Sequence, residues 1–176
     1  MRRTPINGLF ELVSVEFIDS RGAFLNAFRA QEDIFKKCWG DRTISQVNLS
    51  RTDEVGTIRG LHLQAFPNSE AKLVRCLKGR VWDVAVDLRD SSTQYGRWHA
   101  IELSPCCGNA LFIPEGFAHG FQVLEPGSEI LYLHSGRWVP ESETGVRWDD
   151  PHLAIPWPLP VSDMSPRDRS LSFLST

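Results

Sequence analysis

The sequence lacks any stretch of about 20 apolar residues, the length that a membrane-spanning helix needs. Its basic first residues are not followed by the apolar run of a signal peptide. It also lacks a strong charge of either sign, since 176 residues carry a formal net charge of −3. A general nucleic-acid or membrane surface is therefore not expected. These absences favour a cytoplasmic protein whose partners are neither nucleic acids nor membranes.

Cysteine is scarce and shows no ligand spacing. The chain has 4 cysteines, at Cys38, Cys76 and the adjacent Cys106 and Cys107, without a Cys-x-x-Cys pair. A zinc site built on cysteines and a disulfide framework are therefore not expected. Cys76 lies in an alternating segment and is typical of a small core residue. We expect reduced thiols with structural roles.

Helical periodicity is also nearly missing, because the segments between turn signals follow a period of two. The expected strands are 43–49, 57–64, 72–77, 80–89, 98–103, 110–113, 120–124 and 129–134. One helix is expected over 31–38, and the tail after Pro151 reads as loops with a short closing helix. No repeat or linker interrupts the chain. The sequence predicts a single all-β domain, 1–176, built as a sandwich or jelly-roll barrel with a few short helices.

Several of these strands place polar residues on one face. Gln46 and Asn48 share a face, as do His62 and Gln64, and Lys72 has the parity of the apolar residues that follow it. If these faces point inward, the barrel is polar at one end and has room for one ligand. The alternative is that they are solvated strand faces.

Two segments centred on histidine carry the clearest functional signal. The downstream one, read from Gly108 to His119 as G-x5-P-x-G-x2-H, resembles a half-motif of the cupin barrels. In metal-binding cupins the upstream half-motif has two histidines one residue apart. Here that pair is His62 and Gln64, so one metal ligand is missing. The pattern indicates histidines that serve in organic acid–base chemistry.

A series of motifs resembles one family in both order and spacing. The motifs are Asp19-Ser-Arg-Gly22, Gln46-Val-Asn48, Arg59-Gly-Leu-His62, Lys72-Leu-Val, Trp82-Asp-Val-Ala-Val-Asp87, Ile113-Pro-Glu-Gly-Phe-Ala-His-Gly-Phe121, Leu131-Tyr132, Trp148-Asp-Asp-Pro151, Trp157-Pro-Leu159 and Ser165-Pro-Arg-Asp168. Together they are similar to the dTDP-4-dehydrorhamnose 3,5-epimerases, a metal-free branch of the cupins. The resemblance implies a cupin-type jelly roll that needs no metal or cofactor.

The implied reaction inverts C3, C5 or both in a nucleoside-diphosphate 4-keto-6-deoxyhexose. The ketone acidifies the neighbouring C–H bonds, so a base can leave an enolate that is reprotonated from the opposite face. This chemistry needs a base, an acid across the sugar ring and a cation or donor at the enolate oxygen. Members of the family are dimers in which N-terminal strands pack across subunits, so a homodimer is expected.

The resemblance assigns catalytic roles to four residues. His62 corresponds to the base, and histidine suits this role because imidazole exchanges protons near neutral pH. Asp168 corresponds to the carboxylate that orients this histidine. Tyr132 corresponds to the general acid, and Lys72 to the group near the 4-keto oxygen. Without the motifs, each of these residues would be assigned to the core or the surface.

Other residues correspond to substrate-binding positions. Arg59 and Arg167 match phosphate contacts, for which arginine is suited, and Arg21 matches a nucleotide contact. The remaining expected binding residues are Phe24, Asn26, Gln46, Asn48, His119 and Trp138. His119 either assists at the enolate, positions Lys72 or only maintains the frame. Asp83 is either the partner of Lys72 or a polar strand residue.

Two positions depart from the family pattern. Asn26 stands where relatives usually carry an acid, which leaves CDP- and GDP-linked sugars open as substrates. Trp138 stands where relatives usually carry a tyrosine, and it lacks the phenol. Inversion at only one carbon is therefore an alternative. A metal-dependent cupin enzyme, a 3,4-ketoisomerase and a catalytically silent sugar-binding barrel are the further alternatives.

Overall fold

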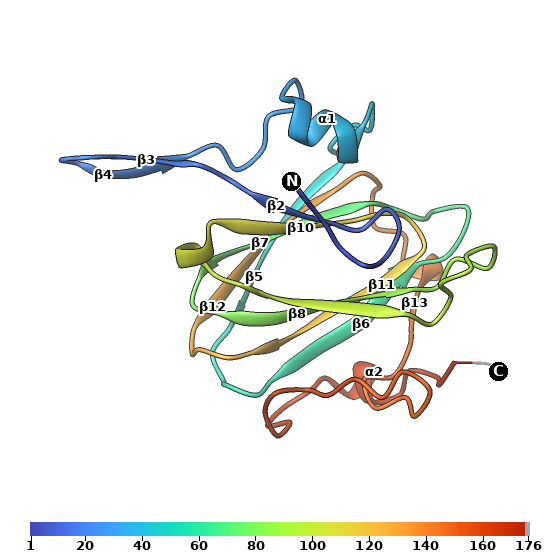
Figure 1. Ribbon diagram of the computed structural model, residues 1–176. Helices are drawn as coiled ribbons and strands as arrows, with labels where there is room; N and C mark the ends of the chain where they lie inside the picture. The colour runs from blue at the N-terminus through green and yellow to red at the C-terminus, as the bar shows by residue number, and fades with distance from the viewer. Residues whose placement is uncertain (175–176) are drawn as a thin grey trace.

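Two antiparallel sheets face each other in the computed structural model, which describes residues 1–174 (Figure 1). The first sheet has the order β1 (Arg2–Arg3), β2 (Phe10–Val13), β10 (Asn109–Ile113), β7 (Lys72–Lys78), β12 (Ser128–His134) and β5 (Gln46–Thr52). The second has the order β13 (Glu143–Gly145), β6 (Ile58–Gln64), β11 (Phe117–Val123), β8 (Val81–Asp87) and β9 (Trp98–Leu103). The all-β prediction is confirmed.

The shorter elements lie around these sheets. They are the hairpin of β3 (Glu16–Asp19) and β4 (Gly22–Leu25), the helices α1 (Asp33–Trp39) and α2 (Pro166–Arg169), and the 3₁₀ turns η1 (Pro105–Cys107) and η2 (Pro140–Ser142). Every strand expected between residues 43 and 134 is present, with ends that shift by a few residues. The expected helix and the short closing helix are also present. Strands β1–β4 and β13 were not predicted, because they are short or carry little alternation.

The central core fills the space between the sheets. Val74 and Cys76 of the first sheet pack in one buried cluster with Val81, Ala85 and Phe121 of the second. The inward positions alternate along each strand, as period-two patterning requires. Cys76 is therefore a core residue, as predicted, and burial raises the pKa of its thiol to about 11.

Both sheets are also covered on their outer faces. α1 places Phe35 and Trp39 against Leu73 and Phe112 of the first sheet. On the second sheet, Val84 and Val86 of β8 pack beneath residues of the C-terminal tail, which runs across that face in Figure 1. This tail buries the second face of β8, so the strand is apolar on both sides. Among residues 1–174 no helix is long and apolar enough to cross a membrane.

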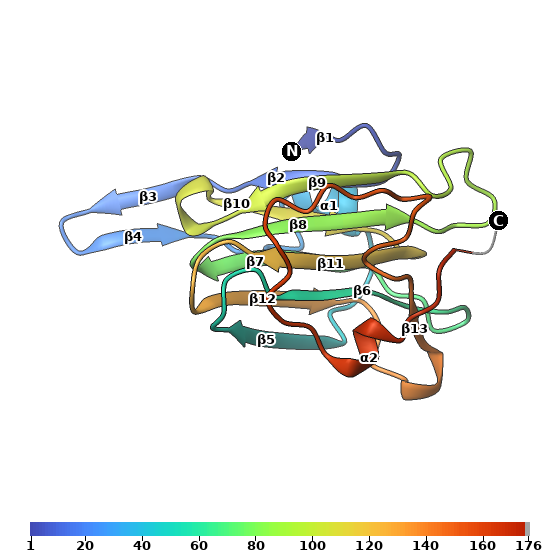
Figure 2. The same cartoon turned by 90° about the horizontal axis from the view of Figure 1, so that it is seen from below.

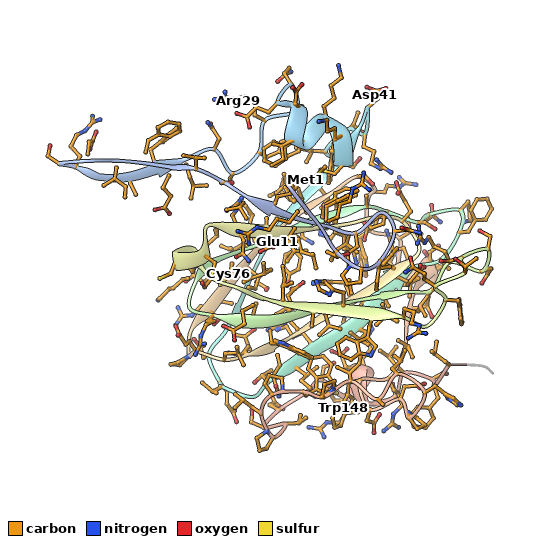
Figure 3. All side chains as sticks on the ribbon, in the orientation of Figure 1. Met1, Glu11, Arg29, Asp41, Cys76 and Trp148 are labelled. Carbon is orange, nitrogen blue, oxygen red and sulfur yellow. The ribbon has the colours of Figure 1, made fainter. Side chains whose placement is uncertain are left out.

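The β3–β4 hairpin extends away from the sandwich, and its side chains have few neighbours from the rest of the chain (Figures 1 and 3). Phe17 is 60% exposed, Ile18 77% and Phe24 64%. Edge strand β5 likewise exposes Val47 and Leu49 on its outer face. Apolar side chains exposed on the hairpin and on an edge strand are typical of surfaces used in protein contacts.

β6 and β11 approach each other closely at Gly60. This residue has φ of +117°, and an added Cβ would lie 2.6 Å from both Gly120 Cα and His119 O. Only glycine combines this backbone conformation with this spacing. The close approach sets the position of the strand that carries His62.

We expect Gly60→Ala to lower the free energy of unfolding by about 2 to 5 kcal/mol, because it adds backbone strain and overpacking. Urea unfolding followed by circular dichroism measures the change. Gly96→Ala is the matched control, since Gly96 also has positive φ, +74°, but its added Cβ would meet nothing closer than 3.9 Å. Equal losses in the two variants would show that the contact with β11 is not costly.

Candidate active site

A cavity of about 1120 Å³ opens between the two sheets. β5 and β6 follow each other in the chain but belong to different sheets, and they form facing walls of this cavity. Figure 2 shows α2 lying on the same side of the molecule, near β6 and β13. Gln46, Asn48, His62, Gln64 and Lys72 all line the cavity, so the prediction of a polar end of the barrel is confirmed. The volume is large enough for a drug-sized or larger ligand.

His62 and Asp168 form a hydrogen-bonded pair at the wall formed by β6. His62 Nε2 donates to Asp168 Oδ1 at 2.8 Å, and the backbone N–H of Gly60 donates to Asp168 Oδ2 at 2.9 Å. The Asp168 side chain is 5% exposed. With Nε2 protonated, Nδ1 is the atom of the neutral ring that can accept a proton.

The first turn of α2 holds Asp168 in place. Ser165 caps this helix, because its Oγ accepts from the backbone N–H of Asp168 at 3.1 Å. Burial alone would raise the pKa of Asp168, but the hydrogen bonds from His62 and Gly60 outweigh it and lower the pKa. The carboxylate therefore stays ionised beside His62.

Tyr132 faces the cavity from β12, in the opposite sheet. Its hydroxyl is hydrogen-bonded to the hydroxyl of Ser50 at 3.1 Å. Its ring lies 6.1 Å from the ring of His119 and 6.0 Å from that of His134. Burial raises the pKa of Tyr132 far above its ordinary value. The phenol consequently keeps its proton throughout the neutral range and is available as a donor.

Lys72 is the buried cation of the site. Its Nζ lies 3.6 Å from Glu70 Oε1 and donates to the backbone oxygen of His62 at 3.4 Å. Burial lowers the pKa of Lys72, and the Glu70 carboxylate opposes this effect. Asp83, considered from the sequence as a partner of Lys72, instead accepts from His119 Nε2 at 2.8 Å. Burial raises the pKa of Asp83, against the attraction of His119.

The other predicted residues of this chain surround the mouth of the cavity. Arg59, Trp138 and Arg167 line it together with the residues above. Arg59 Nε donates to Thr52 Oγ1 at 2.8 Å. Glu143 connects Trp138 with Arg167. Its carboxylate accepts from Trp138 Nε1 at 2.8 Å and pairs with Arg167 Nη2 at 2.6 Å.

Arg21, Phe24 and Asn26 do not reach this cavity. Arg21 sits on the exposed hairpin, where its guanidinium pairs with Asp19 at 2.6 Å. Phe24 and Asn26 line a separate hollow at the base of the hairpin. Within a single chain, the structure therefore separates these predicted binding residues from the remaining ones.

Sequence reasoning missed several residues of the cavity. Ser50, Glu70, His134 and Glu143 all line it. Ser50 was detectable, because it continues the alternation of Gln46 and Asn48 along β5. Glu70 lies just before β7, outside the alternating strand. His134 comes close to Glu70 only because β12 pairs with β7, so no local pattern in the sequence marked either residue.

Gln64, at the position where metal-binding cupins have a second histidine, bonds to the backbone. Its amide donates to Asn68 O at 3.3 Å and to Arg137 O at 3.0 Å, and it accepts from Val139 N. These bonds fix the loop that follows β12. Across residues 1–174, no three His, Cys, Asp or Glu side chains cluster as metal ligands.

The fold and the cavity are those of a jelly-roll enzyme with acid–base side chains on facing walls. The sequence model of the dTDP-4-dehydrorhamnose 3,5-epimerase family matches residues 3–176. The chain belongs to this family. The predicted fold and family are both confirmed.

Curated relatives and solved structures agree with this assignment. The dTDP-4-dehydrorhamnose 3,5-epimerase of Sinorhizobium fredii is 43% identical over 143 residues, 81% of this chain and 72% of the relative. The dTDP-4-dehydrorhamnose 3-epimerase of Streptomyces niveus is 36% identical over 176 residues, 99% of this chain and 84% of the relative. The crystal structure of the 3,5-epimerase from Bacillus anthracis, with TDP and PPi bound, superposes with a TM-score of 0.93 at 34% identity, covering 98% of this chain and 97% of that one.

We expect Asp168→Asn to lower the free energy of unfolding at pH 7 by about 1.5 to 3 kcal/mol, since it removes charged hydrogen bonds. Because the folded pKa of Asp168 is lowered, its stabilisation is present above the unfolded value, about 3.9, and is lost as the pH falls through the folded value. The difference between wild type and variant should therefore shrink in acid.

Urea unfolding at pH 7 and at a series of lower pH values measures this difference. The exposed Asp90→Asn is the control, and its stability should follow the wild type at every pH. A gap between wild type and Asp168→Asn that stays constant into acid would contradict the ionised His62–Asp168 pair.

Proposed function

We propose that the protein epimerises a dTDP-linked 4-keto-6-deoxyhexose, with the 3,5-epimerase reaction of its family as the leading assignment. One observation carries the proposal: His62 on β6 and Tyr132 on β12 face one cavity from opposite sheets. A sugar ring between these walls would have a base on one face and a proton donor on the other. Inversion of a carbon next to a ketone needs this arrangement.

The proposed reaction begins at His62. Its Nδ1 takes the proton from the carbon beside the ketone, and Asp168 stabilises the imidazolium that forms. The electron pair of the broken C–H bond moves to the ketone oxygen, and the Lys72 ammonium stabilises this enolate. Tyr132 then donates its proton to the same carbon from the other face, as the electron pair of the enolate returns to that carbon and the ketone re-forms, and the centre is inverted.

The relatives support the nucleotide part of the substrate. The Bacillus anthracis enzyme was crystallised with TDP and PPi, and both curated relatives act on dTDP-4-dehydrorhamnose by name. Arg59 and Arg167 at the mouth of the cavity provide fixed positive charge for a diphosphate. Asn26, where an acid is usual, keeps another nucleotide base open as an alternative.

Epimerisation at a single carbon is the second candidate. Trp138 lines the cavity where the family usually carries a tyrosine, and its indole N–H is occupied by Glu143. The Streptomyces niveus relative is named as a 3-epimerase, which shows that the family includes such enzymes. The number of carbons that exchange their protons with solvent distinguishes the candidates.

Incubation with dTDP-4-dehydro-6-deoxyglucose in deuterated water should introduce deuterium at C3 and C5, or at only one of these carbons for the second candidate. NMR and mass spectrometry locate the label, with EDTA present in a parallel reaction. We expect His62→Asn to lower kcat at least about 10³-fold, and Tyr132→Phe about 10²- to 10⁴-fold.

Tyr95→Phe is the matched control, because Tyr95 is the other of the 2 tyrosines and lies at the surface. It should retain wild-type turnover. Undiminished label incorporation by His62→Asn would refute the role of His62 as the base. A wild-type protein that labels none of the dTDP, CDP or GDP sugars would refute the function.

We also propose that the protein works as a homodimer in which the β3–β4 hairpin completes the partner's cavity. Arg21 and Phe24 match substrate-binding positions of the family, yet they belong to the hairpin that extends away from the sandwich in Figure 1, and neither lines the cavity of its own chain. The exposed Phe17 and Ile18 give the hairpin an apolar surface for this contact. A second copy related by a two-fold axis would place each hairpin at the other cavity.

Mixing two inactive variants tests this arrangement. His62→Asn removes the proposed base from the sandwich of a protomer, and Arg21→Ala removes the proposed binding residue from its hairpin. Refolded together in equal amounts, they should recover about a quarter of wild-type activity, because each mixed dimer has one intact composite site. If Arg21 served its own chain, mixing would restore nothing. Light scattering should report a dimer, and each variant alone is the control.

A further inference from the structure

Glu70 and His134 form a buried pair at the floor of the cavity, and the proposed reaction uses neither residue. The Glu70 side chain is 7% exposed and that of His134 11%. Glu70 lies just before β7, and His134 ends β12, where it pairs across the sheet with Lys72. Sheet register therefore brings a buried histidine and a buried lysine side by side.

The Glu70 carboxylate bridges these two basic side chains. Its Oε1 lies 3.6 Å from Lys72 Nζ, and its Oε2 lies 3.2 Å from His134 Nδ1. A buried ammonium is costly without an opposite charge nearby. Burial lowers the pKa of Lys72, and Glu70 is the largest influence that raises it.

His134 continues this contact toward the substrate. Its Nε2 lies 3.3 Å from Asn48 Nδ2, so Nε2 accepts from the amide, while its Nδ1 lies within ion-pair distance of Glu70. Asn48 Oδ1 then accepts from Gln46 Nε2 at 2.9 Å, and Gln46 Oε1 accepts from Trp138 N at 3.0 Å. Hydrogen bonds thus connect His134 to Trp138 through Asn48 and Gln46, and the ion-pair contact with Glu70 extends this chain to the buried carboxylate.

We propose that Glu70 and His134 are positioning residues of the epimerase site. Glu70 holds Lys72 as an ammonium at the substrate ketone, and His134 fixes which atoms Asn48 and Gln46 present to the substrate. This inference rests on the proposed function, because that reaction defines what Lys72, Asn48 and Gln46 do toward the substrate. It assigns separate roles, because Glu70 acts on the reacting oxygen and His134 acts on binding.

The other charged and titratable groups around the pair define the test. The charges of Asp83 on β8 and Glu143 on β13 also raise the pKa of Lys72. The ring of His134 also stacks on the ring of Tyr132. These groups remain in a Glu70→Gln variant, which keeps the shape and loses only the charge. Removing the carboxylate removes the main influence that raises the pKa of Lys72. The ammonium is then lost at lower pH.

We expect Glu70→Gln to lower kcat about 10- to 100-fold while KM changes less than about 3-fold. The alkaline limb of its kcat/KM profile should move toward lower pH, because Glu70 is the main influence that raises the pKa of Lys72. Glu102→Gln is the matched control, since it removes a carboxylate that pairs with Arg80 on the surface. An unchanged kcat and an unchanged alkaline limb in Glu70→Gln would overturn the role of Glu70.

His134→Asn separates the second role, because asparagine can still donate to Glu70 but cannot reach Asn48. We expect KM to rise about 10-fold with kcat changed less than about 3-fold. A variant with wild-type KM would overturn the role of His134. Circular dichroism and thermal unfolding confirm that each variant is folded.

An NMR titration of free protein labelled with ¹³C-lysine does not depend on turnover. The Lys72 signal, assigned by its loss in Lys72→Arg, should titrate at lower pH in Glu70→Gln than in wild type, and at the same pH in Glu102→Gln. This shift in a protein without epimerase activity would support the Glu70–Lys72 coupling while the proposed function fails. Normal turnover without the shift would reject the coupling alone.

Discussion

The hydrogen bond between His62 and Asp168 is the contact on which the rest of the site depends. It joins a strand of the barrel to a helix of four residues, Pro166–Arg169, that has no extensive apolar face of its own. The same carboxylate also binds the backbone of Gly60, where β6 and β11 approach most closely. One buried charge therefore fixes the ring of the histidine, the path of its strand and the position of the C-terminal tail. Each of these contacts would be lost if the carboxylate were neutral and turned away.

The sandwich itself supplies the geometry of a two-sided reaction. Residues that alternate inward from the two sheets converge on one space, and strands from different sheets form its opposite walls. Burial raises the pKa of Tyr132 on one wall, whereas hydrogen bonds lower the pKa of Asp168 on the other. The two environments thus shift the two pKa values in opposite directions, and one cavity contains both a protonated phenol and an ionised carboxylate.

Much of the barrel could be predicted from the sequence, because alternation is strong wherever a strand contacts a core on at least one face. The β3–β4 hairpin could not, since its apolar residues Phe17 and Ile18 contact little of their own chain. In the site, His62 was found through its motif. Glu70 and His134 were not, because their meeting depends on cross-strand register, and a single sequence does not specify which strands are neighbours. The predicted Arg21 lies on the hairpin, where it pairs with Asp19, and it does not line the cavity of its own chain.

The long separation in sequence between His62 and Asp168 has a consequence for biosynthesis. A ribosome adds roughly 5 to 20 residues per second, so about 5 to 20 seconds pass between the synthesis of the histidine and that of the carboxylate. During this interval the strands from β7 to β13 are synthesised. Until residue 168 has been added, the nascent chain lacks the carboxylate that orients His62. The proposed base therefore acquires its partner only after the strands that carry His62 and Tyr132 have both been synthesised.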